Sequence, residues 1–287
     1  MCFPIPFPVL FVFLFVLCIE VGASAAPGKT QAGPPAKVRI AGLVIPKVGF
    51  EREKNYQAFE KLARQAAESG ATVVCTPEGF LEGYIVQSKG LTRDAYRDMC
   101  EDIPGGAYVK RMRDLARELS IYIVPGFAEK DADRQYNTAV IISPQGEVVG
   151  KFRKVHNAGD EPFNTTGTTF PVFQLPFAKV GMMICYDRQY PESPRLMSVN
   201  GSQIIFNPSS GMHGGINDTM MVTRAYENGV YIAFVHPEDC LIINPHGDII
   251  ARYDGKNRVV IADLDLSLVG HGAISGRKPH LYQDLAK

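Results

Sequence analysis

Short apolar runs alternate with amphipathic segments along most of this chain. Three runs in the first half are typical of strands, at residues 38–45, 71–78 and 121–129. Two segments between them carry apolar side chains at helical spacing, at residues 51–70 and 108–120. The pattern therefore predicts strands and helices in alternation.

The second half continues this alternation and adds a hairpin. Residues 137–156 form two strand-like halves around a turn at residues 144–146, and residues 178–185 form a further buried strand. We expect helices over residues 191–201 and 216–229, the second starting near Asn217 or Asp218. Further strands are expected over residues 202–208, 230–236, 239–253 and 257–266. These strands are too continuous in apolar content to face water, so the pattern predicts one α/β domain.

Composition and charge narrow the class of protein. The 287 residues are 46% hydrophobic and 21% charged, which excludes disordered and collagen-like chains and suits a globular domain with an ample core. Thirty Lys and Arg residues balance thirty Asp and Glu residues, so no net charge draws the whole protein to nucleic acid or to an anionic membrane. A small neutral or locally charged substrate fits this balance better.

The N-terminal segment differs from the rest of the chain. Residues 3–19 are apolar, and the small residues that follow suit cleavage by a signal peptidase near Ala25. We interpret residues 1–25 as a signal peptide, 26–37 as a flexible leader and 38–287 as the folded domain. The sequence therefore predicts an exported protein, periplasmic or secreted, that is not embedded in a membrane after cleavage. An uncleaved membrane anchor is the alternative.

Four cysteines lie outside the predicted signal peptide, at Cys75, Cys100, Cys185 and Cys240. Their scatter is unlike that of a small disulfide-stapled domain. The chain also has no Cys-x-x-Cys or His-x-x-x-His pair that would indicate zinc, so we expect no metal site. The disulfide state of the cysteines cannot be deduced from their spacing.

Three reactive side chains each close a different predicted strand. These are Glu78, Lys154 and Cys185, and functional groups of helix-covered sheets collect beyond the strand ends. A carboxylate can take the proton of a thiol and later activate water, and an ammonium can hold the oxyanion of a tetrahedral intermediate. A nearby lysine and the helix start after Cys185 would lower the pKa of the thiol.

Each of these residues also has an ordinary interpretation. A cysteine on a strand is more often a small hydrophobe. Glu78 could cap the turn that follows Pro77, and Lys154, next to Lys151 and Arg153, could belong to a solvated basic edge. The combination of all three favours a hydrolytic site.

Three segments, in this order, resemble the signature segments of the nitrilase superfamily of carbon-nitrogen hydrolases: VVCTPEGFLEGY, GKFRKVH and VGMMICYDRQYPESPR. The similarity includes GSQIIFNPSS, TRAYENGVYIAFVH and INPHGDIIA, and it extends from about Val38 to the C-terminus. The resemblance implies an α/β fold of the four-layer α-β-β-α sandwich type with a single catalytic domain. It also implies pairing into homodimers or larger homo-oligomers.

The resemblance assigns roles residue by residue. Cys185 matches the nucleophile of the I-C-Y-D motif, Glu78 the general base of the P-E motif, and Lys154 the lysine of the R-K-x-H motif. Glu161, in the loop after that lysine, is the best match to the family's second glutamate. The implied activity is hydrolysis of a non-peptide carbon-nitrogen bond through a cysteine thioester, with no metal or organic cofactor.

Substrate contacts follow from the same resemblance. The N–H of Tyr186 is expected to face the oxyanion, Arg188 to bind a substrate carboxylate, and His213 to belong to the rim of the pocket. A structural salt bridge to Asp187 or Glu192, or a solvated arginine, is the alternative for Arg188. The expected substrate is a small amide or N-carbamoyl compound rather than a nitrile.

Two other functions remain open from the sequence. A Cys-His thiol hydrolase of another class would use His156 or His236 as its base. A non-catalytic exported binding protein could retain the fold, although intact Glu78, Lys154 and Cys185 argue against it.

Overall fold

The computed structural model describes residues 1–2, 37–159, 161–270 and 273–286. The predicted signal peptide and leader fall almost entirely on residues 3–36 and lie outside this description. Within the part that is described, no helix is long and apolar enough to cross a membrane. Pro34–Lys287 form one compact unit, which contains all the elements below.

The first sheet has seven strands, with the order β13-β1-β2-β3-β5-β4 and with β6 paired to β5. Its strands are β1 (Lys37–Leu43), β2 (Val73–Cys75), β3 (Tyr122–Val124), β4 (Gly126–Asp131), β5 (Arg134–Ile142), β6 (Val148–Arg153) and β13 (Val259–Asp265). The pairs β1–β2 and β2–β3 are parallel, and the other pairs are antiparallel. The predicted hairpin is confirmed, because β5 and β6 join through a turn at residues 144–146.

The second sheet has six strands in the order β12-β11-β10-β9-β8-β7. These are β7 (Val172–Gln174), β8 (Lys179–Met182), β9 (Ile204–Pro208), β10 (Tyr231–Val235), β11 (Cys240–Ile243) and β12 (Ile249–Arg252). The central strands β8, β9 and β10 are parallel, so their carboxyl ends meet at one edge of the sheet.

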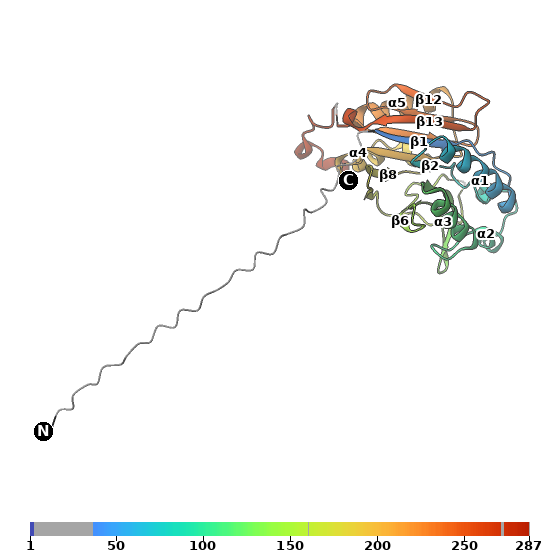
Figure 1. The fold of residues 1–287 in the computed structure, drawn as a ribbon, viewed down its shortest axis with the longest axis horizontal. Coiled ribbons are helices and arrows are strands. Elements are labelled where there is room, and N and C mark those ends of the chain that lie inside the picture. Colours follow the sequence, from blue (N-terminus) through green and yellow to red (C-terminus); the bar gives the residue numbers. More distant parts are fainter. Residues whose placement is uncertain (3–36, 160, 271–272, 287) are drawn as a thin grey trace, which may run out of the picture. The chain divides into compact units, whose positions relative to one another are not determined.

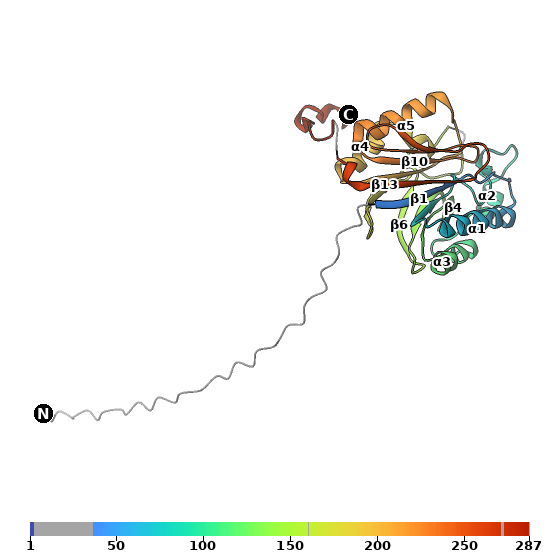
Figure 2. The ribbon, with the colours of Figure 1, turned by 45° about the horizontal axis from the view of Figure 1, so that its top comes forward.

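Helices cover the outer face of each sheet, as Figures 1 and 2 show. The described helices are α1 (Arg52–Glu68), α2 (Arg93–Met99), α3 (Ala107–Leu119), α4 (Glu192–Val199) and α5 (Gly215–Asn228). Apolar residues of α1 and α3 pack with the first sheet, and those of α4 and α5 pack with the second. The predicted four-layer α-β-β-α sandwich is therefore confirmed.

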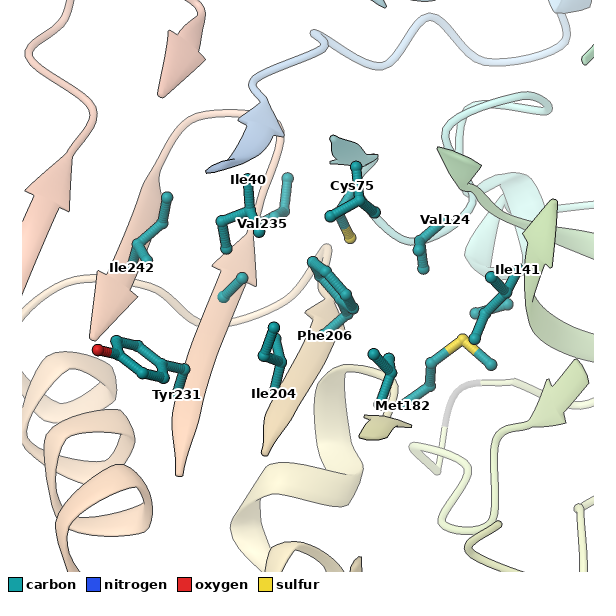
Figure 3. Packing of buried hydrophobic residues seen from close by; sticks show 14 of the residues in the cluster. Ile40, Cys75, Val124, Ile141, Met182, Ile204, Phe206, Tyr231, Val235 and Ile242 are labelled. Atoms are coloured by element: carbon teal, nitrogen blue, oxygen red, sulfur yellow. The ribbon is translucent and has the colours of Figure 1, made fainter. Parts of the chain in front are cut away.

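The core between the two sheets is continuous and apolar. Strand alternation directs Ile40 of β1 into this core and the next residue, Ala41, toward the outer helices. Figure 3 shows side chains of both sheets meeting here, including Cys75 from β2 and Phe206 from β9. Fully burying one such aliphatic or aromatic side chain contributes about 1.5–3 kcal/mol, so this layer holds the two sheets together.

Some predicted boundaries differ from the structure. The run at residues 121–129 divides into β3 and β4 at Pro125, which has no N–H to donate to a ladder. The helix α5 begins at Gly215, one residue before the predicted segment, so Asn217 and Asp218 lie in its first turn; the buried Asn217 Oδ1 accepts a hydrogen bond from Arg188 Nε (2.8 Å). The apolar pattern did not indicate the short helix α2 or the strand β7.

Candidate active site

Glu78 lies just beyond the end of β2, on a segment that both sheets hold. Thr76 Oγ1 accepts a hydrogen bond from the Gly126 N–H (3.0 Å) at the start of β4. The Glu78 N–H donates to the carbonyl of Ser209, which directly follows β9 in the other sheet (3.3 Å). The Glu78 side chain is fully buried. Its carboxylate is therefore fixed where the two sheets meet.

Lys154 directly follows β6 and extends into the same place. Its N–H donates to the carbonyl of Asn137 in β5 (2.8 Å), which fixes the chain beyond the end of β6. Its ammonium donates to Glu78 Oε1 (2.8 Å) and also to Glu161 Oε1. A lysine carries three N–H donors, so one of them remains for a further acceptor.

Glu161, in the loop after β6, accepts hydrogen bonds on both oxygens. Its Oε1 accepts from the Tyr84 hydroxyl (3.1 Å). Its Oε2 accepts from Asn164 Nδ2 (2.9 Å) and Asn137 Nδ2 (3.2 Å). Because Asn137 Nδ2 also donates to Glu78 Oε1 (2.8 Å), one buried amide joins the two carboxylates.

Cys185 begins a short 3-10 helix, Cys185–Gln189, soon after β8 ends. Its φ is +44°, in the left-handed region that side chains with a β-carbon disfavour. Asp187 stabilises this turn by accepting the Ile184 N–H (3.0 Å). The thiol is almost fully buried and accepts a hydrogen bond from Arg188 Nη1 (3.3 Å). The Tyr186 N–H lies in the first turn, where no intrahelical acceptor is available.

Asp187 also ties the cysteine turn to the lysine segment. It accepts the His156 N–H (2.9 Å) and lies 2.8 Å from His156 Nδ1. The His156 ring stacks on Tyr190, with ring centres 3.7 Å apart. Because His156 is only two residues beyond Lys154, this contact fixes the spacing between the ammonium and the thiol.

The two carboxylates of the site have opposite protonation preferences. Burial raises the pKa of Glu78 above its usual value, and the Lys154 ammonium offsets this only in part. Burial would also raise the pKa of Glu161, but Lys154 and the two asparagine donors outweigh it and hold that pKa low. Glu161 is therefore the ionised partner of Lys154, and Glu78 is the carboxylate better suited to take up a proton.

The expectation of a lowered thiol pKa is wrong. Burial, followed by the nearby Glu78, raises the pKa of Cys185, and Arg188, Lys154 and the Ser210 N–H lower it only in part. The helix that was expected to lower it, α4, begins only at Glu192. The thiol is protonated at rest, so it needs a neighbouring base to become a nucleophile.

Three contacts in this site were not predicted, namely those of Tyr84, Asn137 and Ser210. Tyr84 lies in the same signature segment as Glu78, so the segment already contained the signal. Asn137 lies within the largely apolar strand β5, where a buried amide needs hydrogen-bond partners. No comparable pattern singles out Ser210, because its contact with the thiol is made by the backbone.

The predicted substrate contacts lie in different surroundings. Arg188 is buried and donates to Asn217 Oδ1 (2.8 Å), the Met212 carbonyl (2.6 Å) and the Cys185 thiol. None of the ion pairs between described residues includes Arg188, so the alternative of a salt bridge is not observed. Tyr186 is partly exposed beside the thiol. His213 is exposed, and its Nε2 lies 3.3 Å from Glu238 Oε2.

Among the described residues, neither candidate histidine base is hydrogen-bonded to Cys185. His156 faces Asp187, and His236 Nδ1 accepts the Glu238 N–H (3.1 Å). Burial, aided by His213, lowers the pKa of His236 to about 4. The ligand atoms of His213, His236 and Glu238 lie within 4.8 Å of one another, so these three residues could hold a metal ion. Their scatter over two loops explains why sequence spacing did not indicate such a group.

Comparisons with known proteins agree with the fold and with the signature segments. Residues 37–273 match the carbon-nitrogen hydrolase family. A nitrilase from Pyrococcus abyssi is 34% identical over 253 residues, which cover 83% of this chain and 94% of the relative. An omega-amidase from Xenopus tropicalis is 30% identical (80% and 90% covered), and an N-carbamoylputrescine amidase from Solanum lycopersicum is 28% identical (80% and 89%).

A solved structure gives the same result for the fold. The crystal structure of an amidase from Nesterenkonia sp. superposes with a TM-score of 0.73, covering 86% of this chain and 96% of that one at 20% sequence identity. The family match spans most of this chain, and the relatives include several named amidases. The chain therefore belongs to the carbon-nitrogen hydrolases of the nitrilase superfamily, enzymes that hydrolyse non-peptide carbon-nitrogen bonds.

Proposed function

We propose that this protein is an amidase that cleaves an amide or N-carbamoyl group of a small molecule through a thioester on Cys185. The observation that carries the proposal is the convergence of Glu78, Lys154 and Glu161 beside a buried thiol. Glu78 Oε2 is buried and has no hydrogen-bond partner among the described residues. A proton acceptor requires such a free oxygen.

The first half of the reaction forms the thioester. The Cys185 thiol passes its proton to Glu78 as the sulfur attacks the carbonyl carbon. The third N–H of Lys154 and the Tyr186 N–H stabilise the negative charge on the carbonyl oxygen. Glu78 then gives its proton to the nitrogen, the carbon-nitrogen bond breaks, and ammonia or an amine leaves.

The second half hydrolyses the thioester. Glu78, again ionised, takes a proton from a water molecule, and the hydroxide attacks the thioester carbon. The carbon-sulfur bond breaks, and the returning proton restores the thiol. Glu161 stays ionised throughout and, with Asn137, keeps Lys154 in place.

The relatives support an amide or carbamoyl substrate rather than a nitrile. Two of them are named omega-amidase and N-carbamoylputrescine amidase, although a third is named nitrilase. In a variant of the Nesterenkonia amidase, the acetamide moiety of fluoroacetamide adds covalently to the active-site cysteine. We propose the same nucleophilic role for Cys185.

The location and assembly of the protein are further proposals. The apolar run at residues 3–19 supports export, which N-terminal sequencing of the mature protein would test. Exposed apolar side chains on α4 and α5 support a homodimer or a larger homo-oligomer through this helical layer; they are Leu196, Val199, Ile216 and Tyr226. Light scattering would determine the number of subunits.

The experiment that tests the activity measures ammonia or amine release over a panel of amides, N-carbamoyl compounds and nitriles. Mass spectrometry of the quenched enzyme should detect an acyl adduct on Cys185. Cys185→Ala should abolish both signals, whereas Cys75→Ala, a matched change in the core between the sheets, should retain them.

Each rival function predicts a different result. Full activity of Cys185→Ala would overturn the proposal. Hydrolysis of nitriles alone would overturn the substrate class but not the nucleophile. A wild-type protein that hydrolyses nothing would favour the non-catalytic binding protein.

A further inference from the structure

Lys47, in the loop between β1 and α1, lies at the solvent side of the site. Its ammonium donates to Ser210 Oγ (3.2 Å) and to the Ser210 carbonyl (3.4 Å). It also lies 5.4 Å from the centre of the Tyr84 ring, within the range of a cation–π contact. The residue is exposed, so its charge is held in place and still faces solvent.

Both residues that Lys47 contacts also contact the catalytic groups. The Ser210 N–H helps to lower the pKa of the Cys185 thiol, and a Cβ added at the next residue, Gly211, would lie 3.1 Å from the Cys185 sulfur. The Tyr84 hydroxyl donates to Glu161 (3.1 Å). Only Ser210 therefore separates the Lys47 ammonium from the thiol, and only Tyr84 separates it from Glu161.

The positive charge of Lys47 has no direct acidic partner. Among the described residues, no carboxylate lies within ion-pair distance of its ammonium, whose contacts are with Ser210 and the Tyr84 ring. The buried carboxylates Glu78 and Glu161 pair instead with Lys154. Lys47 is therefore a cation that can accept a carboxylate without first giving up another one.

Arg188, the residue first expected to bind a substrate carboxylate, is poorly placed for it. Its side chain is 1% exposed and donates to Asn217, the Met212 carbonyl and Cys185. A substrate carboxylate would have to displace one of these partners. Lys47 instead donates to a single serine and keeps an N–H toward solvent.

We propose that Lys47 binds a carboxylate carried by the substrate, a few atoms from the scissile carbonyl, so that the enzyme prefers anionic amides to neutral or cationic ones. This inference rests on the proposed amidase function and names the substrate class of the same site. Two kinds of compound carry this chemistry. The monoamide of a dicarboxylic acid has the carboxylate on the acyl side, and an N-carbamoyl amino acid has it on the amine side.

The spacing fits a short substrate. One residue spans about 3.5 Å and a polar contact adds about 3 Å at each end, so the Lys47 ammonium and the Cys185 sulfur are about 10 Å apart at most. A substrate with two or three methylenes between its carbonyl and its carboxylate spans this distance. The thiol then attacks the carbonyl carbon while the carboxylate pairs with Lys47.

The test compares matched substrates that differ in charge. Succinic acid monoamide is paired with neutral butanamide, and N-carbamoyl-4-aminobutanoate is paired with cationic N-carbamoylputrescine. The values of kcat and KM are measured for the wild type, Lys47→Met, Lys47→Glu and the control Lys110→Met. The control removes an equal charge from an exposed position on α3, which packs on the outer face of the first sheet.

We expect the wild type to prefer the anionic member of at least one pair by up to about fivefold in kcat/KM, since a charge pair at a protein surface contributes at most about a factor of five. Lys47→Met should raise KM for that substrate by the same factor and leave kcat and the neutral or cationic partner unchanged. Lys47→Glu should shift the preference toward the uncharged or cationic partner. Lys110→Met should match the wild type.

The remaining outcomes overturn the inference in distinct ways. Equal losses on both members of a pair in Lys47→Met would mean that Lys47 only shapes the site. A wild type that hydrolyses these amides without a charge preference, or that prefers the cationic compound, would refute the carboxylate site and leave the amidase proposal standing. A wild type inactive on all four compounds would refute both.

Discussion

Glu129 and Glu78 are both buried carboxylates of the first sheet, and both receive cations from the segment around β6. Glu129, in β4, accepts hydrogen bonds from Arg153 Nε (2.8 Å) and Nη2 (2.6 Å). It also accepts from Lys151 Nζ (2.9 Å) and Thr138 Oγ1 (2.7 Å). Both oxygens are satisfied. Burial alone would raise the pKa of Glu129, but these donors outweigh it and hold that pKa below its usual value.

Glu78 receives its donors differently. Lys154 and Asn137 both donate to Oε1, and Oε2 has no partner among the described residues. Burial then prevails, and the pKa is raised. The comparison teaches that the number of satisfied oxygens separates a carboxylate that stabilises the fold from one that can accept a proton, although both are buried beside a cation.

The largest expected effect is on turnover. Glu78→Gln should lower kcat by about 10²–10⁴-fold, because an amide cannot take the proton of the thiol or of water. Glu129→Gln should leave kcat close to that of the wild type, because Glu129 contacts neither the thiol nor Lys154. Ammonia release per mole of folded protein measures both.

A comparable loss of kcat in the two variants would break the distinction between the two carboxylates. Glu78→Asp serves as a second variant, since it keeps the carboxylic acid but shortens the side chain by one methylene. It should be more active than Glu78→Gln.

The next largest effect is on stability, and here Glu129→Gln should lose more than Glu78→Gln. Glu129→Gln should lower the free energy of unfolding by about 2–3 kcal/mol, because breaking this buried pair leaves Lys151 without its carboxylate and Arg153 with Asp131 alone. These cations are partly exposed, so water compensates some of the loss. Glu78→Gln should change the free energy of unfolding by under about 1 kcal/mol, because Glu161 still pairs with Lys154. Urea denaturation followed by circular dichroism measures both values.

The pH dependence sharpens the same contrast. The pKa of Glu129 is lower in the folded state than its unfolded value of about 4.3, so its stabilisation is present above that value and is lost as the pH falls through the folded pKa. The stability deficit of Glu129→Gln should therefore shrink in acid.

The contribution of Glu78 to stability has the opposite pH dependence. Its folded pKa is raised, so its contribution is present below the unfolded pKa and is lost as the pH rises through the folded pKa. Glu78→Gln should gain stability relative to the wild type as the pH rises. Denaturation curves between pH 4 and pH 9 test both trends, and parallel curves for the two variants would contradict the assignment.

The smallest expected effect concerns His156. His156→Ala removes one contact to Asp187, and a lost hydrogen bond of about 1 kcal/mol corresponds to about a fivefold fall in kcat. The pH profile of kcat/KM should keep its shape. A loss as large as that of Glu78→Gln, with a changed profile, would instead support a Cys-His hydrolase.

Sequence pattern was enough to predict one domain of alternating strands and helices and to locate Glu78, Lys154 and Cys185 beyond three strands, whereas the four-layer arrangement followed from the family resemblance. Strand alternation explains why the pattern could not go further at β6. Phe152 faces the core, so Lys151 and Arg153 face the other way and reach Glu129. The expected basic edge fits these two residues, which are partly exposed, but not Lys154, which is buried beyond the end of the strand.

Other features depend on contacts that pattern does not contain. The thiol pKa is set by burial and by Glu78, whereas the sequence displays only the neighbouring lysine and helix start. The buried contact between Asn217 and Arg188 joins α5 to the cysteine turn across 29 positions in the chain. The position of Lys47 over Ser210 joins residues 163 positions apart in the chain. Long-range contacts of this kind become visible only in three dimensions.

The contacts of the Asn137 amide bear on the stage of folding at which the site can form. The side chains it helps to align come from distant parts of the chain, since Glu78 lies 59 residues from Asn137 and 76 from Lys154. Bringing such segments together costs loop-closure entropy that only the completed sandwich repays. A nascent or partly unfolded chain therefore carries Cys185 as an ordinary thiol, and the finished fold is itself the step that assembles the candidate nucleophile and its base.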